Sequence, residues 1–256
     1  MSAEPPDGAL AVHLARRAGD LLCRLRTEVG FADPAALRAE GDRRSHALIT
    51  AGLARSRPGD AVLSEEGTRD AADRVGASRV WIVDPLDGTR EYAEAGREDW
   101  AVHVALWEAG SAAPSELTAG AVALPAQGRV LSTVTPPPPL PLHSGPLRLA
   151  ASRSRAPEFL TGLAERLGAV LVPMGSAGAK CAAVVAGAAD AYVHAGGQYE
   201  WDSAAPVAVA SAAGLHTSRL DGSPLTYNHP DPWLPDLVVC RPDVADRLLL
   251  ALGGLS

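Results

Sequence analysis

Two carboxylates stand three residues apart in the segment WIVDPLDGTREY, directly after a run of bulky apolar side chains. These acids are Asp84 and Asp87. Pro85 fixes the backbone after the first acid, so the turn that follows should bring the Leu86 carbonyl, the Asp87 carboxylate and the Thr89 hydroxyl to one side. The pattern D-P-x-D-G-T is expected by chance in roughly one chain of this length in ten thousand. The segment therefore predicts a group of oxygen ligands at the end of a strand.

Further acids stand where strands end or helices are expected to begin. Glu65 and Glu66 follow the strand-like segment AVLS, and Asp42 and Asp202 stand at expected helix starts. Each alone fits an ordinary role, because Asp is a favoured N-cap and paired glutamates suit a solvated loop. Carboxylates that crowd together repel one another unless cations lie between them. If these acids converge, an all-oxygen site selects Mg²⁺ or Mn²⁺ and should hold more than one ion.

Composition limits the class of protein and its partners. The 256 residues, 47% of them hydrophobic, suffice for one large domain or two modest lobes. A net charge of -7 argues against binding to a nucleic acid polymer but leaves room for a small anionic ligand. No apolar run is long enough to cross a bilayer and no secretory signal is evident, so a cytoplasmic protein without membrane attachment is expected.

The elements that must position these acids follow from the spacing of apolar residues. Apolar positions at helical intervals over residues 10–25 predict a first helix, and a second is expected to start near Asp42. Strands are expected to end just before Glu65 and at Asp84. Another strand over residues 100–107 and a hairpin around an Ala-Gln-Gly turn complete a mostly antiparallel sheet.

A proline-rich segment over residues 135–146 divides the chain. Proline lacks a backbone donor and favours an extended conformation, so this segment is expected to be a surface connector. It separates an N-terminal α+β lobe, residues 1–140, from a C-terminal lobe, residues 141–256. In the second lobe strand and helix patterns alternate, which is typical of an α/β arrangement. The first lobe carries the metal motifs, and the second is expected to select the substrate.

The acidic segments resemble those of a known family. SEEG, WIVDPLDGT and WDSAAPVAVASAAG resemble, in order and spacing, the three signatures of the inositol monophosphatase-like superfamily of lithium-sensitive, magnesium-dependent phosphomonoesterases. The segments ASRSR and MGSAGAKCAAVVAG, with the Glu before Trp201 and Asp202, are similar to the CysQ branch, the 3′(2′),5′-bisphosphate nucleotidases. The resemblance covers most of the chain. It implies an α/β (α+β) fold, a layered α-β-α-β-α sandwich.

The resemblance also implies a site for two or three Mg²⁺ ions, with Mn²⁺ as a substitute. Glu65, Asp84 and the Leu86 carbonyl correspond to the ligands of a first metal. Asp84, Asp87 and Asp202 correspond to the ligands of a second, so that Asp84 bridges the two. A weaker third metal would use Glu65 together with water.

The attacking water is implied to be oriented and deprotonated by a pair formed by Asp42 and Thr89. The family's usual run before this Asp is missing, and ALRAEGD stands in its place. Gly88 and Thr89 are expected to offer backbone amides to the phosphate oxygens.

Substrate contacts are expected mainly from the second lobe. Lys180 is the only lysine of the chain and falls in GSAGAK, which resembles the segment that holds the nucleotide sugar and its second phosphate. The ordinary alternative is a lysine on a helix surface. The residues implied to contact the substrate are Gly88, Thr89, Arg90, Ser152, Arg153, Ser176, Lys180 and Asp202.

The leading hypothesis is a phosphatase that removes the 3′-phosphate of 3′-phosphoadenosine 5′-phosphate, and that also accepts the corresponding phosphosulfate, in sulfur assimilation. One alternative is a phosphatase for inositol 1-phosphate or fructose 1,6-bisphosphate, which would share the metal chemistry. Another is a non-catalytic phosphate-binding relative, whose mark would be a lost metal ligand. None of the acids is lost. Inhibition by Li⁺ follows from the resemblance, and either a monomer or a homodimer is compatible with the sequence.

Overall fold

Two five-stranded sheets carry the fold in residues 5–67, 72–138, 145–153 and 158–253, the part of the chain that the computed structural model describes. The strands are β1 (Ala61–Ser64), β2 (Arg79–Asp87), β3 (Ala101–Glu108), β4 (Leu117–Leu124), β5 (Arg129–Ser132), β6 (Arg148–Ser152), β7 (Val170–Met174), β8 (Ala191–Tyr199), β9 (His216–Ser218) and β10 (Trp233–Cys240). The helices are α1 (Asp7–Val29), α2 (Pro34–Ser56), α3 (Ala72–Val75), α4 (Thr89–Tyr92), α5 (Glu158–Leu167), α6 (Ala177–Val185), α7 (Glu200–Ala212) and α8 (Pro242–Gly253). Two short 3-10 helices, η1 (Pro114–Glu116) and η2 (Pro125–Gln127), flank β4.

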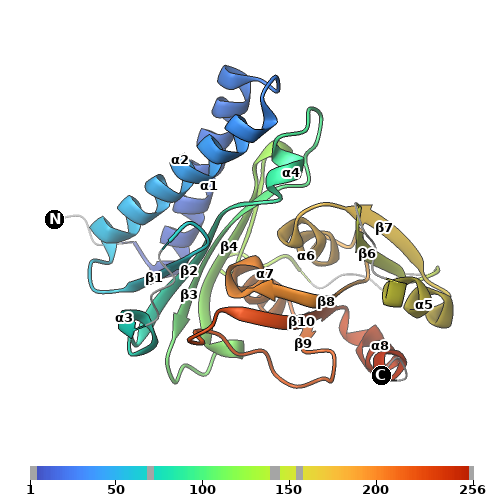
Figure 1. Ribbon diagram of the computed structural model, residues 1–256. Helices are drawn as coiled ribbons and strands as arrows, with labels where there is room; N and C mark the ends of the chain where they lie inside the picture. The colour runs from blue at the N-terminus through green and yellow to red at the C-terminus, as the bar shows by residue number, and fades with distance from the viewer. Residues whose placement is uncertain (1–4, 68–71, 139–144, 154–157, 254–256) are drawn as a thin grey trace.

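These elements stack in five layers (Figure 1). Helices α1 and α2 cover one face of the first sheet, and α7 packs on its other face against β2, β3 and β4. Helices α6 and α7 also contact the second sheet, whose far side carries α5 and α8. The α-β-α-β-α order that the family resemblance implied is therefore present.

Helix α2 begins earlier than the sequence pattern suggested. Asp33 caps it, because its carboxylate accepts hydrogen bonds from the backbone amides of Ala35 and Ala36 at 3.1 and 3.0 Å. Pro34 occupies the first helical position, where its missing amide costs nothing. The expected start near Asp42 was wrong, and Asp42 lies in the middle of the helix with its side chain on a half-buried face.

The first sheet has the strand order β1-β2-β3-β4-β5. Only β1 and β2 run parallel, and the remaining neighbours are antiparallel. The predicted hairpin is confirmed, since β4 pairs with β5 across η2 and Gly128. This mostly antiparallel sheet presents β2, which carries the DPLDG segment, near its centre.

The second sheet is mixed, with the order β7-β6-β8-β10-β9. Strand β6 runs parallel to β7 and β8, whereas β10 is antiparallel to β8 and β9. The alternation of strands and helices after residue 145 agrees with the sequence pattern. Residues 139–144 of the expected connector lie outside the described residues. Since the core between the sheets combines side chains from both halves, the division at residue 140 stays a proposal about organisation.

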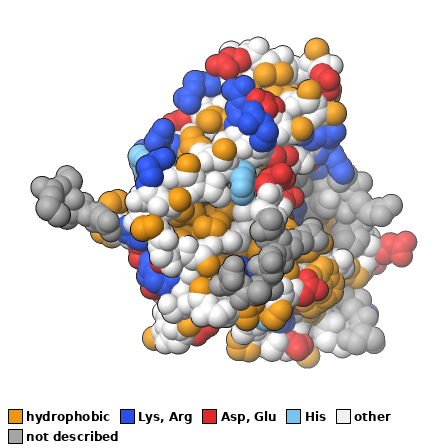
Figure 2. All heavy atoms as spheres, turned by 60° about the vertical axis from the view of Figure 1, so that its left-hand side comes forward, with side chains coloured by type: hydrophobic (Ala, Val, Ile, Leu, Met, Phe, Trp, Pro, Cys, Tyr) orange, Lys and Arg blue, Asp and Glu red, His pale blue; other side chains and the backbone are white. Residues whose placement is uncertain are grey.

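Two further observations concern the outer face of the molecule and its helices. Charges of both signs are interspersed on the face that α1 and α2 form (Figure 2), where Arg43 and Arg44 both pair with Glu40. Of the helices in the described ranges, none combines the length and the apolar character needed to span a membrane.

Candidate active site

Three carboxylates from distant parts of the chain meet between the two sheets. Asp84 and Asp87 lie on β2 and Asp202 lies in the first turn of α7, and each offers an oxygen within 4.8 Å of the others. In a regular strand, residues three apart point to opposite faces. The pairing of β2 with β3 shifts register between Asp84 and Asp87, and this irregularity allows both carboxylates to face the same site.

The turn after Asp84 is held at two points. The Asp84 carboxylate accepts a hydrogen bond from the Leu86 amide at 3.0 Å, which closes a local Asp turn. The buried hydroxyl of Ser45 donates to the Pro85 carbonyl at 2.6 Å and fastens the turn to α2. Proline's fixed backbone and these two bonds hold the irregular end of β2, which runs to Asp87 and does not end at Asp84 as the sequence predicted.

Asp87 is held by the start of α6. Its Oδ2 accepts from the Ser176 hydroxyl at 2.5 Å and the Gly178 amide at 2.6 Å, and its Oδ1 accepts from the Ala177 amide at 3.2 Å. Burial alone would raise the pKa of Asp87, but the contacts with His103 and Ser176 lower it to about 2. Asp87 is thus an anion at neutral pH.

The other two carboxylates of this triad carry unbalanced charge. Burial, followed by the charges of Glu65 and Asp87, raises the pKa of Asp84 well above its ordinary value. Burial and the charge of Asp87 raise the pKa of Asp202 to about 6, although the Tyr199 amide donates to Asp202 Oδ2 at 2.6 Å. Cations would relieve this repulsion, and a hard divalent ion suits an all-oxygen donor set. The residues present therefore fit a metal site.

Glu65 lies just beyond β1, outside the group of three carboxylates. Its residue is exposed, yet loss of solvation around the carboxylate and the charges of Asp202 and Asp42 raise its pKa to about 7. Glu65 is electrostatically part of the site. Its role as a metal ligand, like that of the Leu86 carbonyl, stays a prediction.

Asp42 reaches the same electrostatic neighbourhood from α2. Its Oδ1 is buried and has no hydrogen-bond partner among the described residues. Loss of solvation and the charge of Glu66 raise the pKa of Asp42 to about 7. Thr89 stands at the start of α4, and the hydrogen bonds of the described residues include none between it and Asp42. The pair formed by Asp42 and Thr89 therefore stays a prediction. The Oδ1 atom of Asp42 is available to accept a hydrogen bond.

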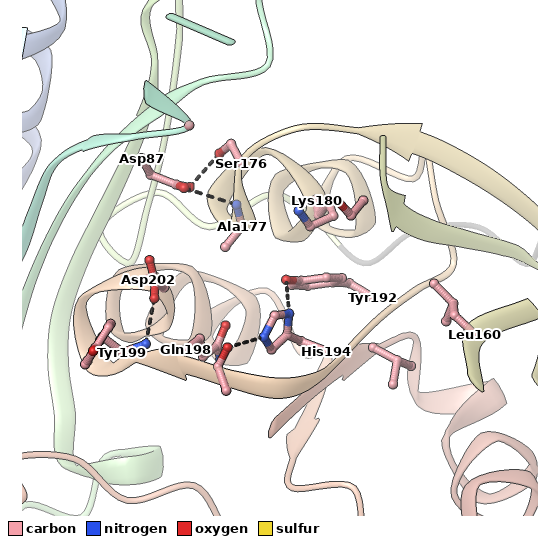
Figure 3. Close-up of a pocket in the computed structure, with 14 residues that line it drawn as sticks. Asp87, Leu160, Ser176, Ala177, Lys180, Tyr192, His194, Gln198, Tyr199 and Asp202 are labelled. Atoms are coloured by element: carbon pink, nitrogen blue, oxygen red, sulfur yellow. Dashed lines mark hydrogen bonds between the residues drawn. The ribbon is translucent and has the colours of Figure 1, made fainter. Parts of the chain in front are cut away.

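A cavity of about 460 Å³ opens beside the carboxylates (Figure 3). Five of the residues expected to contact the substrate line it, namely Gly88, Ser152, Ser176, Lys180 and Asp202. Gly88 has a positive φ of 81°, and a Cβ there would lie 2.9 Å from the Ser176 Cβ. Only glycine fits both this backbone conformation and the close approach of α6.

Lys180 is buried, with 7% of its surface exposed, which rules out the ordinary alternative of a surface lysine. Its ammonium donates to the Gly175 carbonyl at 3.2 Å and lies 5.2 Å from the centre of the Tyr192 ring. Burial lowers the pKa of Lys180, while the nearby charge of Asp87 opposes this shift. Among the described residues that line the cavity, Lys180 is the only lysine or arginine (Figure 3).

The two arginines suggested as substrate contacts lie differently. Arg153 is exposed and donates to Glu91 and Glu94 at 3.1 and 2.7 Å. Arg90 is exposed, and neither arginine is among the residues that line the cavity. Thr89 is also absent from that lining. Their substrate contacts stay predictions.

Several residues of the site were not singled out from the sequence. The imidazole of His103 is fully buried, with Nδ1 3.1 Å from the Trp201 carbonyl and Nε2 3.3 Å from Asp87 Oδ2. Burial would lower the pKa of His103, but the contact with Asp87 raises it. A polar residue inside the apolar strand WAVHVALW was the available signal.

The cavity wall opposite α6 comes from β8. His194 contacts the Tyr192 hydroxyl through Nδ1 at 3.3 Å and the Gly197 carbonyl through Nε2 at 2.8 Å (Figure 3). A carbonyl only accepts, so Nε2 carries the proton and the Tyr192 hydroxyl donates to Nδ1. The side-chain amide of Gln198 is buried without a hydrogen-bond partner among the described residues.

Glu200, the residue before Trp201 that favoured the nucleotidase branch, serves the fold in this structure. It is fully buried and accepts from the backbone amides of Asn228 and His229 at 2.9 and 2.8 Å. Arg74 donates to the Asn228 side chain at 2.5 Å. These bonds fasten the first turn of α7, and with it Asp202, to a distant loop.

Known proteins match this chain over nearly its whole length. The sequence profile of the inositol monophosphatase family matches residues 9–251. A 3′-phosphoadenosine 5′-phosphate phosphatase of Mycobacterium leprae (strain TN) is 53% identical over 254 residues, which cover 96% of this chain and 93% of the relative. The 3′(2′),5′-bisphosphate nucleotidase CysQ of Escherichia coli (strain K12) is 30% identical over 84% of this chain and 91% of its own length.

Solved structures agree with the sequence matches. The crystal structure of CysQ from Bacteroides thetaiotaomicron, described as a bacterial member of the inositol monophosphatase family, superimposes with a TM-score of 0.78 at 26% identity. The match covers 92% of this chain and 97% of that structure. The fold and the family expected from the acidic segments are confirmed, and the chain belongs to the inositol monophosphatase family.

Proposed function

We propose that this chain is a phosphomonoesterase that removes the 3′-phosphate of 3′-phosphoadenosine 5′-phosphate, giving AMP, in sulfur assimilation. The observation that carries the proposal is a cavity whose wall includes Asp87 and Asp202, two of the three clustered carboxylates, together with Lys180. A substrate with two phosphates needs two kinds of anion site, one formed with cations and one formed by the protein. The names of the relatives at 53% and 30% identity support the same substrate. The corresponding phosphosulfate fits the same description.

We propose Mg²⁺ as the natural ion, in two or three copies, with Mn²⁺ as a substitute. Asp84, Asp87 and Asp202 would hold it, joined by Glu65 and the Leu86 carbonyl as the family resemblance implies. Bound Mg²⁺ would supply Lewis-acid stabilisation of the charge that develops on the phosphoryl group. The raised pKa values of Asp84 and Asp202 support such a role, because burial and the neighbouring negative charges disfavour the ionised carboxylates and a bound cation offsets both.

The reaction proposed is an in-line attack of water on phosphorus with cleavage of the bond to the 3′ oxygen. The free oxygen of Asp42, whose pKa is raised to about 7, suits a group that accepts the proton of that water near neutral pH. The departing 3′ oxygen takes up a proton from solvent water, which balances the proton that Asp42 accepts from the attacking water. The positive-φ turn at Gly88 brings the backbone against the cavity, where its amides can meet phosphate oxygens.

Lys180 would bind the phosphate that is not transferred. Its ammonium is a compact charge in a wall that also includes Ser152, Tyr192 and His194. A point charge is suited to a phosphate that has no metal ligand of its own. This division of the two phosphates sets the direction in which the nucleotide lies.

The test compares phosphate release from 3′-phosphoadenosine 5′-phosphate, inositol 1-phosphate and fructose 1,6-bisphosphate with Mg²⁺, with and without Li⁺. The bisphosphate nucleotide should give the highest kcat/KM, and Li⁺ should inhibit its hydrolysis. A higher kcat/KM for either sugar phosphate would replace the proposed substrate. The Asp84→Asn variant is the control for the site: it should keep the circular dichroism of the native protein and lose turnover. Absence of phosphate release from all three substrates would favour a non-catalytic relative.

A monomer or homodimer and a cytoplasmic location remain predictions from the sequence.

A further inference from the structure

The imidazole of His103 contacts the elements that carry two of the three carboxylates. Its Nδ1 lies 3.1 Å from the carbonyl of Trp201, and its Nε2 lies 3.3 Å from Oδ2 of Asp87. Because a carbonyl oxygen only accepts, Nδ1 is the donor in the first contact. In the sheet, His103 is also the direct cross-strand partner of Asp84.

The first of these contacts fixes the start of α7. Trp201 is buried and stacks on Tyr199 with ring centres 4.6 Å apart. The next residue is Asp202, whose carboxylate accepts a hydrogen bond from the Tyr199 amide at 2.6 Å. This bond ties the position of the carboxylate to the backbone of the first turn of α7. A bond to the Trp201 carbonyl therefore also places Asp202.

The second contact fixes Asp87 together with α6. A Cβ on Gly178 would lie 2.0 Å from His103 Nε2, and the Gly178 amide donates to Asp87 Oδ2 at 2.6 Å. Helix α6 approaches the ring more closely than any side chain at this position would permit. Strand β2, helix α6 and helix α7 thus meet at one imidazole.

Packing in the core alone does not explain why residue 103 is a polar histidine. His103 is 0% exposed, and its nearest neighbours on the same face of β3 are Ala101 and Ala105, both fully buried. Burying a polar ring costs free energy unless its nitrogen atoms find partners. His103 Nδ1 is hydrogen-bonded to the Trp201 carbonyl, and Nε2, which has no hydrogen bond among the described residues, lies 3.3 Å from Asp87 Oδ2.

We propose that His103 is a positioning residue that holds Asp87 and Asp202 at the separation a divalent cation requires. The inference rests on the metal site of the proposed function. His103 is not proposed to donate a proton to the substrate. The width of the ring sets the distance between β2 and the first turn of α7, because Nδ1 is hydrogen-bonded to the Trp201 carbonyl and Nε2 is in ion-pair contact with Asp87.

The test measures Mn²⁺ binding, as a probe of the site, by electron paramagnetic resonance titration of the free ion. His103→Ala should weaken binding about 10- to 100-fold, the usual effect of losing a group that orients metal ligands. His103→Gln places an amide nitrogen near the position of Nε2 and should restore part of the affinity through Asp87. His103→Asn places one near Nδ1 and should restore only the contact with Trp201, leaving Asp87 without its partner.

Val104→Ala is the matched control. Val104 is fully buried on the opposite face of β3, among the residues that pack against α1 and α2. It should lower the midpoint of thermal unfolding and leave Mn²⁺ affinity within about twofold of the native value. If the loss of Mn²⁺ affinity simply paralleled the drop in unfolding temperature across all four variants, the positioning role of His103 would be overturned.

The results separate the two proposals. A native protein that fails to bind Mn²⁺ would refute the metal site and with it the proposed function. A native protein that binds Mn²⁺ while the Gln and Asn variants bind equally well would refute only the role of His103. If His103→Ala does not fold, those two variants still decide the question. A parallel assay should show a raised Mg²⁺ activation constant, with kcat at saturating Mg²⁺ much less affected.

Discussion

At the scale of single residues, the two oxygens of Asp87 have different surroundings. Oδ2 accepts from Ser176 and Gly178 and contacts His103, whereas Oδ1 has one longer bond, 3.2 Å to the Ala177 amide. Ligation through Oδ1 leaves the shorter contacts intact. The carboxylate can then be oriented by α6 and still present an oxygen to a cation.

Lys180 gives a prediction at the same scale, about which phosphate it binds. Lys180→Met keeps the length of the side chain and removes its charge. The variant should lower kcat/KM for 3′-phosphoadenosine 5′-phosphate about 10- to 100-fold, since a hydrogen bond to a charged group contributes about 1.5 to 3 kcal/mol. Steady-state phosphate release measures the effect. Hydrolysis of a substrate with a single phosphate, such as 4-nitrophenyl phosphate, should change much less.

Arg90→Met is the matched control for this variant. Arg90 is exposed and is not part of the cavity wall. Its replacement removes the same charge from the molecule without removing a buried cation. If Arg90→Met lowered kcat/KM as much as Lys180→Met, the second phosphate would be bound by long-range charge or by Arg90 itself.

At the scale of elements, the turn from β2 into α4 depends on a glycine that touches α6. Gly88→Ala imposes a positive φ of 81° on a residue with a side chain and brings its Cβ to 2.9 Å from the Ser176 Cβ. The backbone conformation costs about 1 to 2 kcal/mol. Displacing Ser176, which bonds to Asp87, should lower kcat on the order of tenfold or more. Urea unfolding and phosphate release measure the two effects.

Gly110→Ala separates backbone strain from collision. Gly110 also has a positive φ, 71°, but a Cβ there would meet nothing within 4 Å. This variant should lose a similar free energy of unfolding through its backbone and keep native activity. Equal activity losses in the two variants would show that the contact of Gly88 with Ser176 is unimportant.

Local patterns predicted most of these elements because their causes are local. The apolar repeat of α1, the alternation of β3 and the proline of the DPLDG turn act within a few residues. The start of α2 was misplaced for a comparable reason. Asp33 before Pro34 is a stronger helix start than Asp42, and the sequence interpretation gave weight to the wrong Asp.

The contacts that complete the site could not be predicted from local patterns. His103 meets Trp201 98 positions along the chain, and Ser176 meets Asp87 at a separation of 89. The burial of Lys180 depends on how α6 packs between the sheets. Arg153, expected at the substrate, instead pairs with Glu91 and Glu94. Such contacts depend on the tertiary arrangement. The family resemblance implied the fold, but it did not predict these individual contacts.

At the scale of the whole molecule, the layer order explains why acids so far apart in the sequence converge. The helices α6 and α7 lie between the two sheets and contact both (Figure 1). Their first turns bring Ser176 and Asp202 to β2, where Asp84 and Asp87 end the strand. The carboxylates are therefore gathered inside the fold, and their mutual repulsion acts on the stability of the whole protein.

That repulsion predicts how stability depends on pH without a divalent cation. The pKa values of Asp202, Glu65 and Asp42 are raised to about 6, 7 and 7, against about 4 in the unfolded chain. A group with a raised pKa stabilises the fold fully below pH 4, and this contribution is lost as pH rises through 6 to 7. Asp87, with its pKa lowered to about 2, has the opposite sign, but its contribution is lost only below pH 4.

The midpoint of thermal unfolding in EDTA should therefore fall between pH 5 and pH 8, and Mg²⁺ should reverse this fall by stabilising the ionised carboxylates. At a concentration about 100 times its dissociation constant, Mg²⁺ contributes about 2.7 kcal/mol, or about 5 to 10 °C for a chain of this size. Differential scanning fluorimetry at four pH values, with EDTA or Mg²⁺, measures the difference between the two conditions. The difference should grow with pH and largely disappear in Asp84→Asn. Stabilisation by Mg²⁺ that is as large at pH 5 as at pH 8 would contradict the prediction, because protonated carboxylates bind the ion more weakly than ionised ones.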